Sequence, residues 1–202
     1  MSVETIAILD FGSQYTHLIA RRVRSCQVYC EIFPPSTPVS ELRKHNVRGV
    51  VLSGGPSSVY APNAPMPDPA LFSSGLPVLG ICYGMQVMAH MLGGKVESSE
   101  KREFGYAKLL IKEHDEIFFG LRATIDVWMS HGDAVEKLPQ GFDILAYTFN
   151  APAAAIRNRH KKLYGIQFHP EVSHTAYGKE IMRNFLFKVC GCKGDWTMKS
   201  FI

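Results

Sequence analysis

Three side chains in this sequence are of the types needed for nucleophilic catalysis: a cysteine, a histidine and a glutamate. Cys82 is the centre of Gly80-Ile-Cys-Tyr-Gly84. His169 and Glu171 lie two residues apart in Phe168-His-Pro-Glu-Val172. A thiol attacks a carbonyl carbon once a base has taken its proton, and a carboxylate beside an imidazole selects the tautomer and stabilises the imidazolium. A Cys-His-Glu triad is therefore predicted if the fold brings these residues together.

Cys82 is predicted at the junction of a strand and a helix. Val78–Ile81 is an apolar run of strand length, and after Cys82 apolar residues recur at helical spacing until Gly93-Gly94. Glycines two residues before and after a cysteine relieve the crowding of a sharp strand-to-helix turn, as in the Gly-x-Ser-x-Gly elbow of hydrolases. A helix N-terminus also favours a thiolate and offers N–H groups to an oxyanion. The motif by itself equally fits a buried structural cysteine.

The His169–Glu171 pair follows a predicted late strand, Lys162–Phe168. Pro170 fixes its own φ and pushes the preceding histidine towards extended geometry. Residues two apart in an extended segment point the same way, so the two side chains are predicted to share a face. They would lie at the sheet edge where Cys82 is also expected. The alternative is a surface pair without a catalytic role.

A glycine pair follows another apolar strand, in Ser53-Gly-Gly-Pro56. Bare backbone N–H groups can approach a ligand closely at such positions. Gly54 is therefore expected beside the ligand, and the Gly55 N–H is expected to act with the Tyr83 N–H on an oxyanion. A plain turn that ends a strand fits this motif as well.

The elements that must position these residues alternate between strands and helices, which predicts an α/β fold with a mostly parallel central sheet and helices on both faces. From Lys95 to Phe149 several strand-like pieces occur without a long helix, which predicts a smaller antiparallel addition. Arg21, Arg22 and Arg24 are expected on the outer side of the first helix. The predicted strands are Thr5–Asp10, Val28–Phe33, Gly49–Ser53, Val78–Ile81, Ala153–Ile156 and Lys162–Phe168, and the predicted helices include Leu18–Val23 and Met182–Val189.

Composition places the chain among globular proteins and limits the classes of partner that are expected. It has 202 residues, of which 46% are hydrophobic and 20% charged, with a net charge of +4. The basic cluster Arg157–Lys162 is interpreted as a solvated turn, because no basic helix face accompanies it, and no nucleic acid is expected. No apolar run approaches the ~18 residues of a membrane span, and no signal-peptide pattern is present, so no membrane is expected. The five cysteines include no Cys-x-x-Cys pair, so neither a disulfide framework nor a metal site is expected. This cysteine usage fits a reducing, cytoplasmic setting.

Gly80–Gly84, His169–Glu171 and Ser53–Pro56, in this order and spacing, resemble the class I (triad-type) glutamine amidotransferases over almost the whole chain. The resemblance implies their flavodoxin-like fold. Further segments closely resemble the amidotransferase domains of GMP synthetases. These segments are Leu9–Tyr15, Arg102–Tyr106, Val127–Asp133 and His169–His174.

The resemblance implies that Cys82 attacks the side-chain amide of L-glutamine and forms a γ-glutamyl thioester. His169 would act as acid and then as base, and Glu171 would hold it. The backbone N–H groups of Gly55 and Tyr83 would stabilise the oxyanion.

Four further residues match positions that hold the glutamine substrate: Gln86, Ser130, His131 and Asp133, the last three in an expected loop, Ser130–Asp133. Asp133 is a candidate partner for the substrate's ammonium group. In the alternative, Gln86 is an ordinary helix residue and Asp133 a turn former.

The resemblance also implies a partner. Residues 1–190 would form the amidotransferase domain, and residues 191–202 would begin a linker to an absent ATP-pyrophosphatase (synthetase) domain, on the same chain or a separate subunit. ATP, magnesium and XMP would bind there, with no cofactor in residues 1–190, and a homodimer through that domain is left open. Arg102 and His174 are candidates for coupling. Two other functions stay open: the same chemistry serving another acceptor, and a catalytically silent partner-binding domain.

Overall fold

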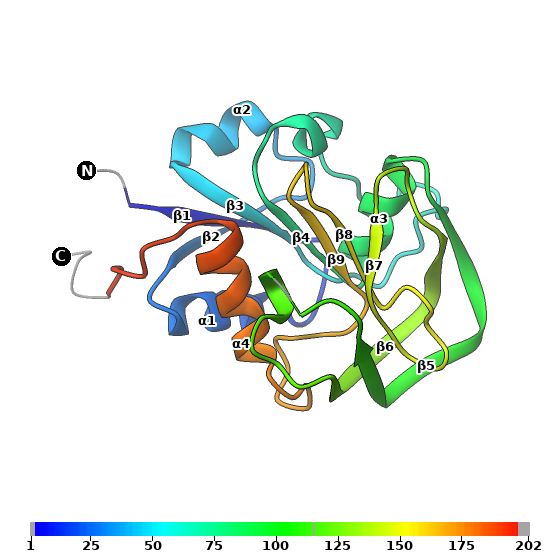
Figure 1. Cartoon of the computed structure of the whole chain (residues 1–202). Coiled ribbons are helices and arrows are strands. Elements are labelled where there is room, and N and C mark those ends of the chain that lie inside the picture. Colours follow the sequence, from blue (N-terminus) through cyan, green and yellow to red (C-terminus); the bar gives the residue numbers. More distant parts are fainter. Residues whose placement is uncertain (1–2, 115, 198–202) are drawn as a thin grey trace.

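The computed structural model describes residues 3–114 and 116–197, and one mixed sheet dominates it (Figure 1). Its nine strands lie in the order β2-β1-β3-β4-β9-β8-β7-β5-β6. The strands are β1 Thr5–Leu9, β2 Tyr29–Phe33, β3 Val47–Leu52, β4 Val78–Ile81, β5 Lys95–Ile111, β6 Thr124–Lys137, β7 Asp143–Tyr147, β8 Ala155–Asn158 and β9 Leu163–Ile166. The α-helices are α1 Thr16–Ser25, α2 Val39–Leu42, α3 Tyr83–Met91 and α4 Gly178–Asn184, and shorter helical turns are Arg43–His45, Pro69–Ser73, Glu116–Phe118 and Phe185–Val189.

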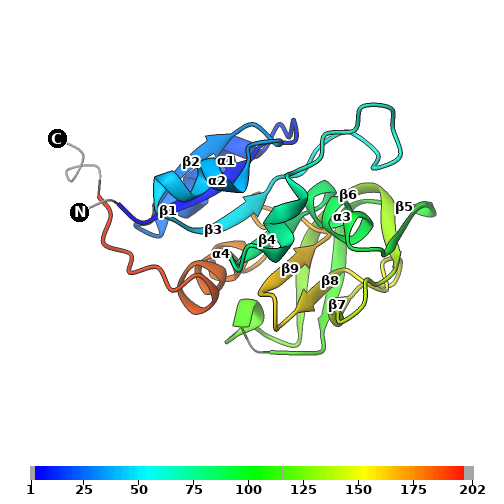
Figure 2. The ribbon, with the colours of Figure 1, turned by 90° about the horizontal axis from the view of Figure 1, so that it is seen from above.

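The first half of the sheet is parallel and covered on both faces, as predicted. β1, β2, β3, β4 and β9 run in the same direction. Side chains of β1 alternate between two cores: Ile6 and Ile8 pack on the side of α1 and α4, whereas Ala7 and Leu9 pack on the side of α3. Figures 1 and 2 show α1 and α4 on one face and α2 and α3 on the other. Burial of both faces explains why these strands are apolar runs.

The predicted antiparallel addition is confirmed, and it continues the same sheet. β8 pairs antiparallel with β9, β7 with β8, and the long strands β5 and β6 form the far edge. The prediction of a loop at Ser130–Asp133 is wrong, because these residues belong to β6. The alternation of buried Val127 and Met129 continues to buried His131, so the strand persists, and β5 absorbs a register shift between Ser98 and Glu103.

Two smaller expectations are also corrected. The basic cluster is only partly a solvated turn: Arg157 lies in β8, is buried, and donates from Nη1 to Glu116 Oε2 at 3.0 Å. The last helix is not α-helical throughout, because the Cys190 N–H reaches back five residues to Phe185 O at 2.9 Å, which marks a π turn. None of the described helices has both the length and the apolar character needed to traverse a bilayer.

Candidate active site

A cavity of about 580 Å³ opens at the carboxyl edge of the parallel strands, where ligands of open α/β sheets bind. The turn after β1, the end of β3, the junction of β4 with α3 and the segment after β9 all contribute to its wall, and β6 closes the far side. Of the residues singled out in the sequence, Cys82, His169, Gly55, Gln86, Ser130, His131 and Asp133 line it.

Cys82 is held in a conformation that non-glycine residues rarely adopt, with φ 52° and ψ −107°. Its N–H donates to Ile166 O at 2.8 Å, and its carbonyl accepts from the first turn of α3. The predicted role of the flanking glycines is confirmed. A Cβ on Gly80 would lie 2.6 Å from the carbonyl carbon of Gly84, and one on Gly84 would lie 2.5 Å from Leu52 O.

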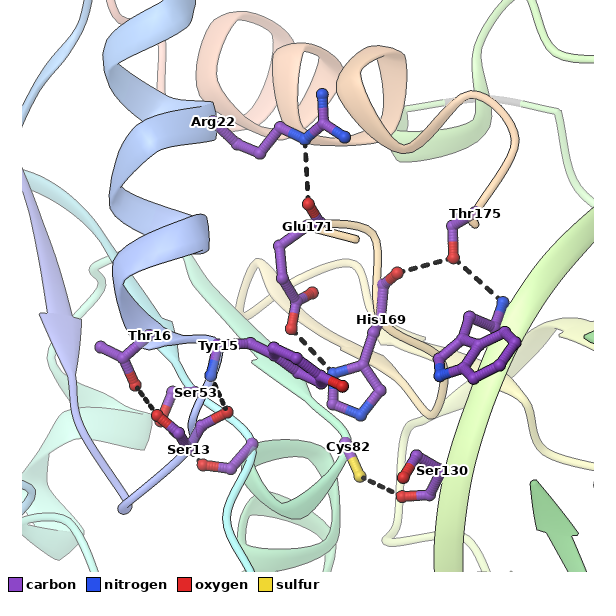
Figure 3. A network of polar contacts seen from close by, with 12 residues as sticks. Ser13, Tyr15, Thr16, Arg22, Ser53, Cys82, Ser130, His169, Glu171 and Thr175 are labelled. Atoms are coloured by element: carbon purple, nitrogen blue, oxygen red, sulfur yellow. Dashed lines mark hydrogen bonds and ion pairs between the residues drawn. The ribbon is translucent and has the colours of Figure 1, made fainter. Parts of the chain in front are cut away.

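His169 and Glu171 form a buried pair, with Nδ1 and Oε1 2.7 Å apart (Figure 3). Glu171 occupies Nδ1, which leaves Nε2 as the ring nitrogen available to Cys82. Burial lowers the pKa of His169, but its hydrogen bonds with Cys82 and Glu171 and the charges of both groups outweigh burial and raise it to about 10. With this raised pKa, the imidazole holds its proton near neutral pH. The second carboxylate oxygen of Glu171, Oε2, has no donor among the described residues.

The predicted extended geometry of this pair is wrong, because Glu171 lies in a turn. Neighbouring elements clamp that turn. The His169 N–H donates to Trp128 O at 3.1 Å, and the Thr175 hydroxyl donates to His169 O at 2.6 Å and accepts from the Trp128 N–H at 3.0 Å. Arg22, expected on the outer side of its helix, is half-buried and donates from Nε to Glu171 O at 3.1 Å. These contacts fix the pair to β6 and to α1.

The start of α3 leaves one N–H group available. The Gly84 N–H donates to Ser53 O, and the N–H groups of Met85 and Gln86 both donate to Cys82 O, each at 3.1 Å. The Tyr83 N–H has no acceptor among the residues that the structure describes. An unpaired N–H next to the cysteine is what an oxyanion requires.

The two glycines after β3 lie on the other side of the same space. A Cβ on Gly54 would come within 3.2 Å of His169 Cε1 and 3.7 Å of Cys82 Cβ, so the backbone passes directly beside both residues. Gly55 lines the cavity, and a Cβ there would meet Phe11 O at 2.5 Å. A larger residue at either position would crowd this wall of the site.

The residues expected to hold substrate form a network of their own. Gln86 donates from Nε2 to Asp133 O at 2.7 Å, so this amide group is already bound within the protein. Ser130 O lies 3.6 Å from Cys82 Sγ. His131 is buried, with Nδ1 3.1 Å from Asp133 O and Nε2 3.6 Å from Oε2 of Glu103. Glu103, which the sequence did not single out, therefore stands behind this wall.

Tyr15 was named in the sequence analysis only as the end of the segment Leu9–Tyr15, without a role of its own. Its ring meets the His169 ring edge-on, with centroids 5.4 Å apart, as Figure 3 shows. The turn that carries it is shaped by Asp10, whose Oδ1 accepts from the Gly12 N–H at 2.9 Å and from the Thr16 hydroxyl at 2.7 Å. A general signal was present, because the turn after the first parallel strand must emerge at the same edge as Cys82.

The coupling candidates lie elsewhere. The side chain of Arg102 is outside the described residues. His174 is exposed and packs against Trp128 and Tyr106, with ring centroids 4.7 and 5.9 Å away. Within the described residues, His, Cys, Asp and Glu side chains form no group of three or more that could hold a metal ion.

Comparison with known proteins agrees with this geometry. Residues 7–189 match the family model described as glutamine amidotransferase class-I. GMP synthase [glutamine-hydrolyzing] of Caldicellulosiruptor saccharolyticus is 53% identical over all 202 residues, and that of Aquifex aeolicus is 54% identical over the same span. The chain spans 40% of the length of each of these relatives.

Solved structures show the same fold. A protein of Thermoplasma acidophilum described as one subunit of a GMP synthase superimposes with a TM-score of 0.83 at 32% identity, with 95% of this chain and 96% of that one covered. A glutamine amidotransferase of Thermotoga maritima gives a TM-score of 0.71 at 20% identity, covering 94% and 99% of the two chains. By sequence over nearly its whole length and by fold, the chain belongs to the class I glutamine amidotransferase family.

Proposed function

We propose that this chain hydrolyses L-glutamine to glutamate and ammonia through Cys82, His169 and Glu171. The observation that carries the proposal is the meeting of these residues: Cys82 and His169 line one cavity, and His169 Nδ1 lies 2.7 Å from Oε1 of the buried Glu171. A nucleophile, a base and a group that orients the base are the parts that covalent catalysis needs.

The reaction proceeds in two halves. The sulfur of Cys82 bonds to the side-chain carbonyl carbon of glutamine, and the carbonyl electrons move onto oxygen. The carbon–nitrogen bond then breaks, and ammonia leaves with the proton of His169. Water, deprotonated by the now neutral imidazole, attacks the thioester, and the carbon–sulfur bond breaks to release glutamate. The two halves together replace one difficult amide hydrolysis with two easier steps.

The oxyanion of both halves is stabilised by backbone donors. The N–H of Tyr83 has no acceptor among the described residues, and Gly55 lines the cavity. One such donor typically contributes about 3 kcal/mol to the transition state. Gln86, Ser130, His131 and Asp133 would bind the amino acid part of glutamine, with the Asp133 carboxylate facing its ammonium, and Gly54 would border the scissile amide.

The ammonia would pass to a synthetase domain that uses ATP and magnesium to aminate XMP to GMP. This is supported by relatives that are GMP synthases, of which the chain spans 40%. The synthetase domain would lie on the same chain or on a separate subunit, with residues 191–202 leading towards it in the first case. Arg102 and His174 would transmit its state to the glutaminase site.

The test is glutamine hydrolysis by this chain, alone and with a synthetase domain, ATP and XMP. Cys82→Ala should abolish hydrolysis, whereas Cys26→Ala, which alters a buried cysteine away from the cavity, should retain it. Stimulation by the partner and XMP supports the GMP assignment. Full activity of Cys82→Ala would refute the nucleophile, and hydrolysis without coupling to XMP would point to another acceptor. No hydrolysis even with the partner and both ligands would favour a catalytically silent domain.

A further inference from the structure

The sulfur of Cys82 has a second polar neighbour that the triad does not include. Gln167 donates from Nε2 to Sγ at 3.6 Å. Its side chain is 1% exposed, and its own backbone N–H is bound to Ala154 O at 2.8 Å, so the residue is fixed at both ends. A primary amide buried against a thiol can donate a hydrogen bond to the sulfur without carrying a charge.

The orientation of this amide follows from a chain of contacts. Asp133 O can only accept, and it lies 2.7 Å from the terminal nitrogen of Gln86, which fixes the Gln86 amide. The same nitrogen of Gln86 lies 3.3 Å from Gln167 Oε1. If the Gln167 amide were flipped, two NH₂ groups would face each other. The backbone of β6 therefore determines, through two buried amides, that Gln167 presents donors to Cys82.

We propose that Gln167 is a further catalytic residue, whose side-chain N–H holds the sulfur of Cys82 as an anion before the attack on substrate. The inference rests on the proposed glutaminase function. When the proton is on His169, the sulfur can no longer donate to Ser130 O, whereas Gln167 remains its donor. As the sulfur–carbon bond forms, the negative charge moves from sulfur to the substrate oxygen, and the Gln167 contact weakens while the oxyanion contacts form.

The proposal makes a prediction for the chemistry of Cys82 that needs no glutamine. In Gln167→Met, which keeps the length of the side chain but removes the donor, alkylation of Cys82 by iodoacetamide should become half-maximal about one pH unit higher, the tenfold expected for one hydrogen bond to an anion. A less stabilised thiolate is also a stronger nucleophile, so the plateau rate should rise about threefold. On the acid side the rate should fall about threefold. The two pH profiles should therefore cross.

The controls separate Cys82 from other thiols and the donor from the packing. Peptide mapping identifies the alkylated cysteine. Burial raises the pKa of the other four thiols, to about 11 for Cys30 and about 12 for Cys192, and also for Cys26 and Cys190. Gln140→Met changes an exposed glutamine outside the cavity and should leave the profile unchanged. Gln167→Glu is isosteric and places a carboxylate at the sulfur, so it should move the profile further than Gln167→Met, and it remains informative if the methionine variant does not fold.

A folded Gln167 variant whose profile coincides with that of the unsubstituted chain, or is only scaled by one factor, would overturn the proposal. Scaling alone is what a merely structural role predicts. Glutamine hydrolysis is measured in parallel with the synthetase domain, ATP and XMP. If hydrolysis is absent while the shifted profile is present, the proposed function fails and the sulfur contact stands. If hydrolysis depends on Cys82 and the profile does not shift, only the role of Gln167 is refuted.

Discussion

The backbone of Cys82 allows a test of the strand-to-helix turn that is independent of catalysis. With φ 52° and ψ −107°, any residue with a Cβ is strained there, and glycine is not. Cys82→Ala and Cys82→Gly both remove the sulfur, but only the glycine variant relieves the strain. Comparing the two variants with each other removes the effect of the lost thiol.

The expected difference follows from three contributions. Replacing alanine with glycine costs about 0.5–1 kcal/mol in backbone entropy. Removing a buried methyl group costs up to about 0.8 kcal/mol more. Relief of strain at this conformation contributes on the order of 1–3 kcal/mol in the opposite direction. With the full methyl contribution and the centres of the other two ranges, Cys82→Gly should be more stable than Cys82→Ala by roughly 0.5 kcal/mol.

Urea unfolding of the two variants measures the difference, with Ala89→Gly as a matched control. Ala89 is a buried alanine of α3 in ordinary helical conformation, so its substitution should lose about 1.5 kcal/mol without compensation. In thermal unfolding of a chain this long, 1 kcal/mol corresponds to roughly 2–4 °C. If Cys82→Gly were less stable than Cys82→Ala by as much as Ala89→Gly is below the parent, the turn would carry no strain and the reasoning would be refuted.

Three further predictions concern packing and charge. Gly84→Ala places a methyl group 2.5 Å from a carbonyl oxygen of β3 and should lose about 2 kcal/mol or more in urea unfolding, whereas Gly132→Ala, with nothing within 4 Å, should change stability by less than about 0.5 kcal/mol. Glu171→Gln removes a charge that raises the pKa of His169, so the alkaline limb of kcat/KM should move to lower pH. Burial raises the pKa of Glu116, but hydrogen bonds from a tyrosine and two arginines outweigh burial and lower it. The stabilisation that this carboxylate contributes is therefore present above its ordinary pKa of 4.5 and is lost as pH falls. Glu116→Gln should reduce the unfolding free energy near neutral pH by about 1–2 kcal/mol.

Each of these has a contradicting result. Equal stability of Gly84→Ala and Gly132→Ala would mean that α3 can shift away from β3. An alkaline limb that stays in place in Glu171→Gln would mean that Cys82 alone maintains the protonated imidazole. Glu116→Gln as stable as the parent near neutral pH, and as tolerant of acid, would mean that its three donors find equivalent partners elsewhere. The pH dependence of stability that arises from His169 has the opposite sign to that from Glu116. The pKa of His169 is raised from 6.5 to about 10, so its contribution to the unfolding free energy is complete below pH 6.5 and is lost as pH rises through about 10.

Local sequence was sufficient for the parallel half of the fold and for predicting that His169 and Glu171 would pair, as the 2.7 Å contact between them confirms. The apolar run Val78–Ile81 is β4 with the predicted bounds, and the glycines around Cys82 mark a turn that only a missing Cβ permits. Such signals are local, because strand length, helical period and steric crowding depend on residues a few positions apart. The loop expected at Ser130–Asp133 failed because strand continuity there depends on pairing with β5, which local pattern does not report.

Only the tertiary structure decided how the site is held. Arg22 reaches Glu171 across 149 residues, and Gln167 reaches Cys82 across 85. The Tyr83 N–H is identified as unpaired because no acceptor for it lies within residues 3–114 and 116–197. These are directional contacts of short range, and whether they form depends on ångström-scale placement of distant segments. The sequence determined which chemical groups this protein possesses, and the fold determined which atoms of those groups face one another.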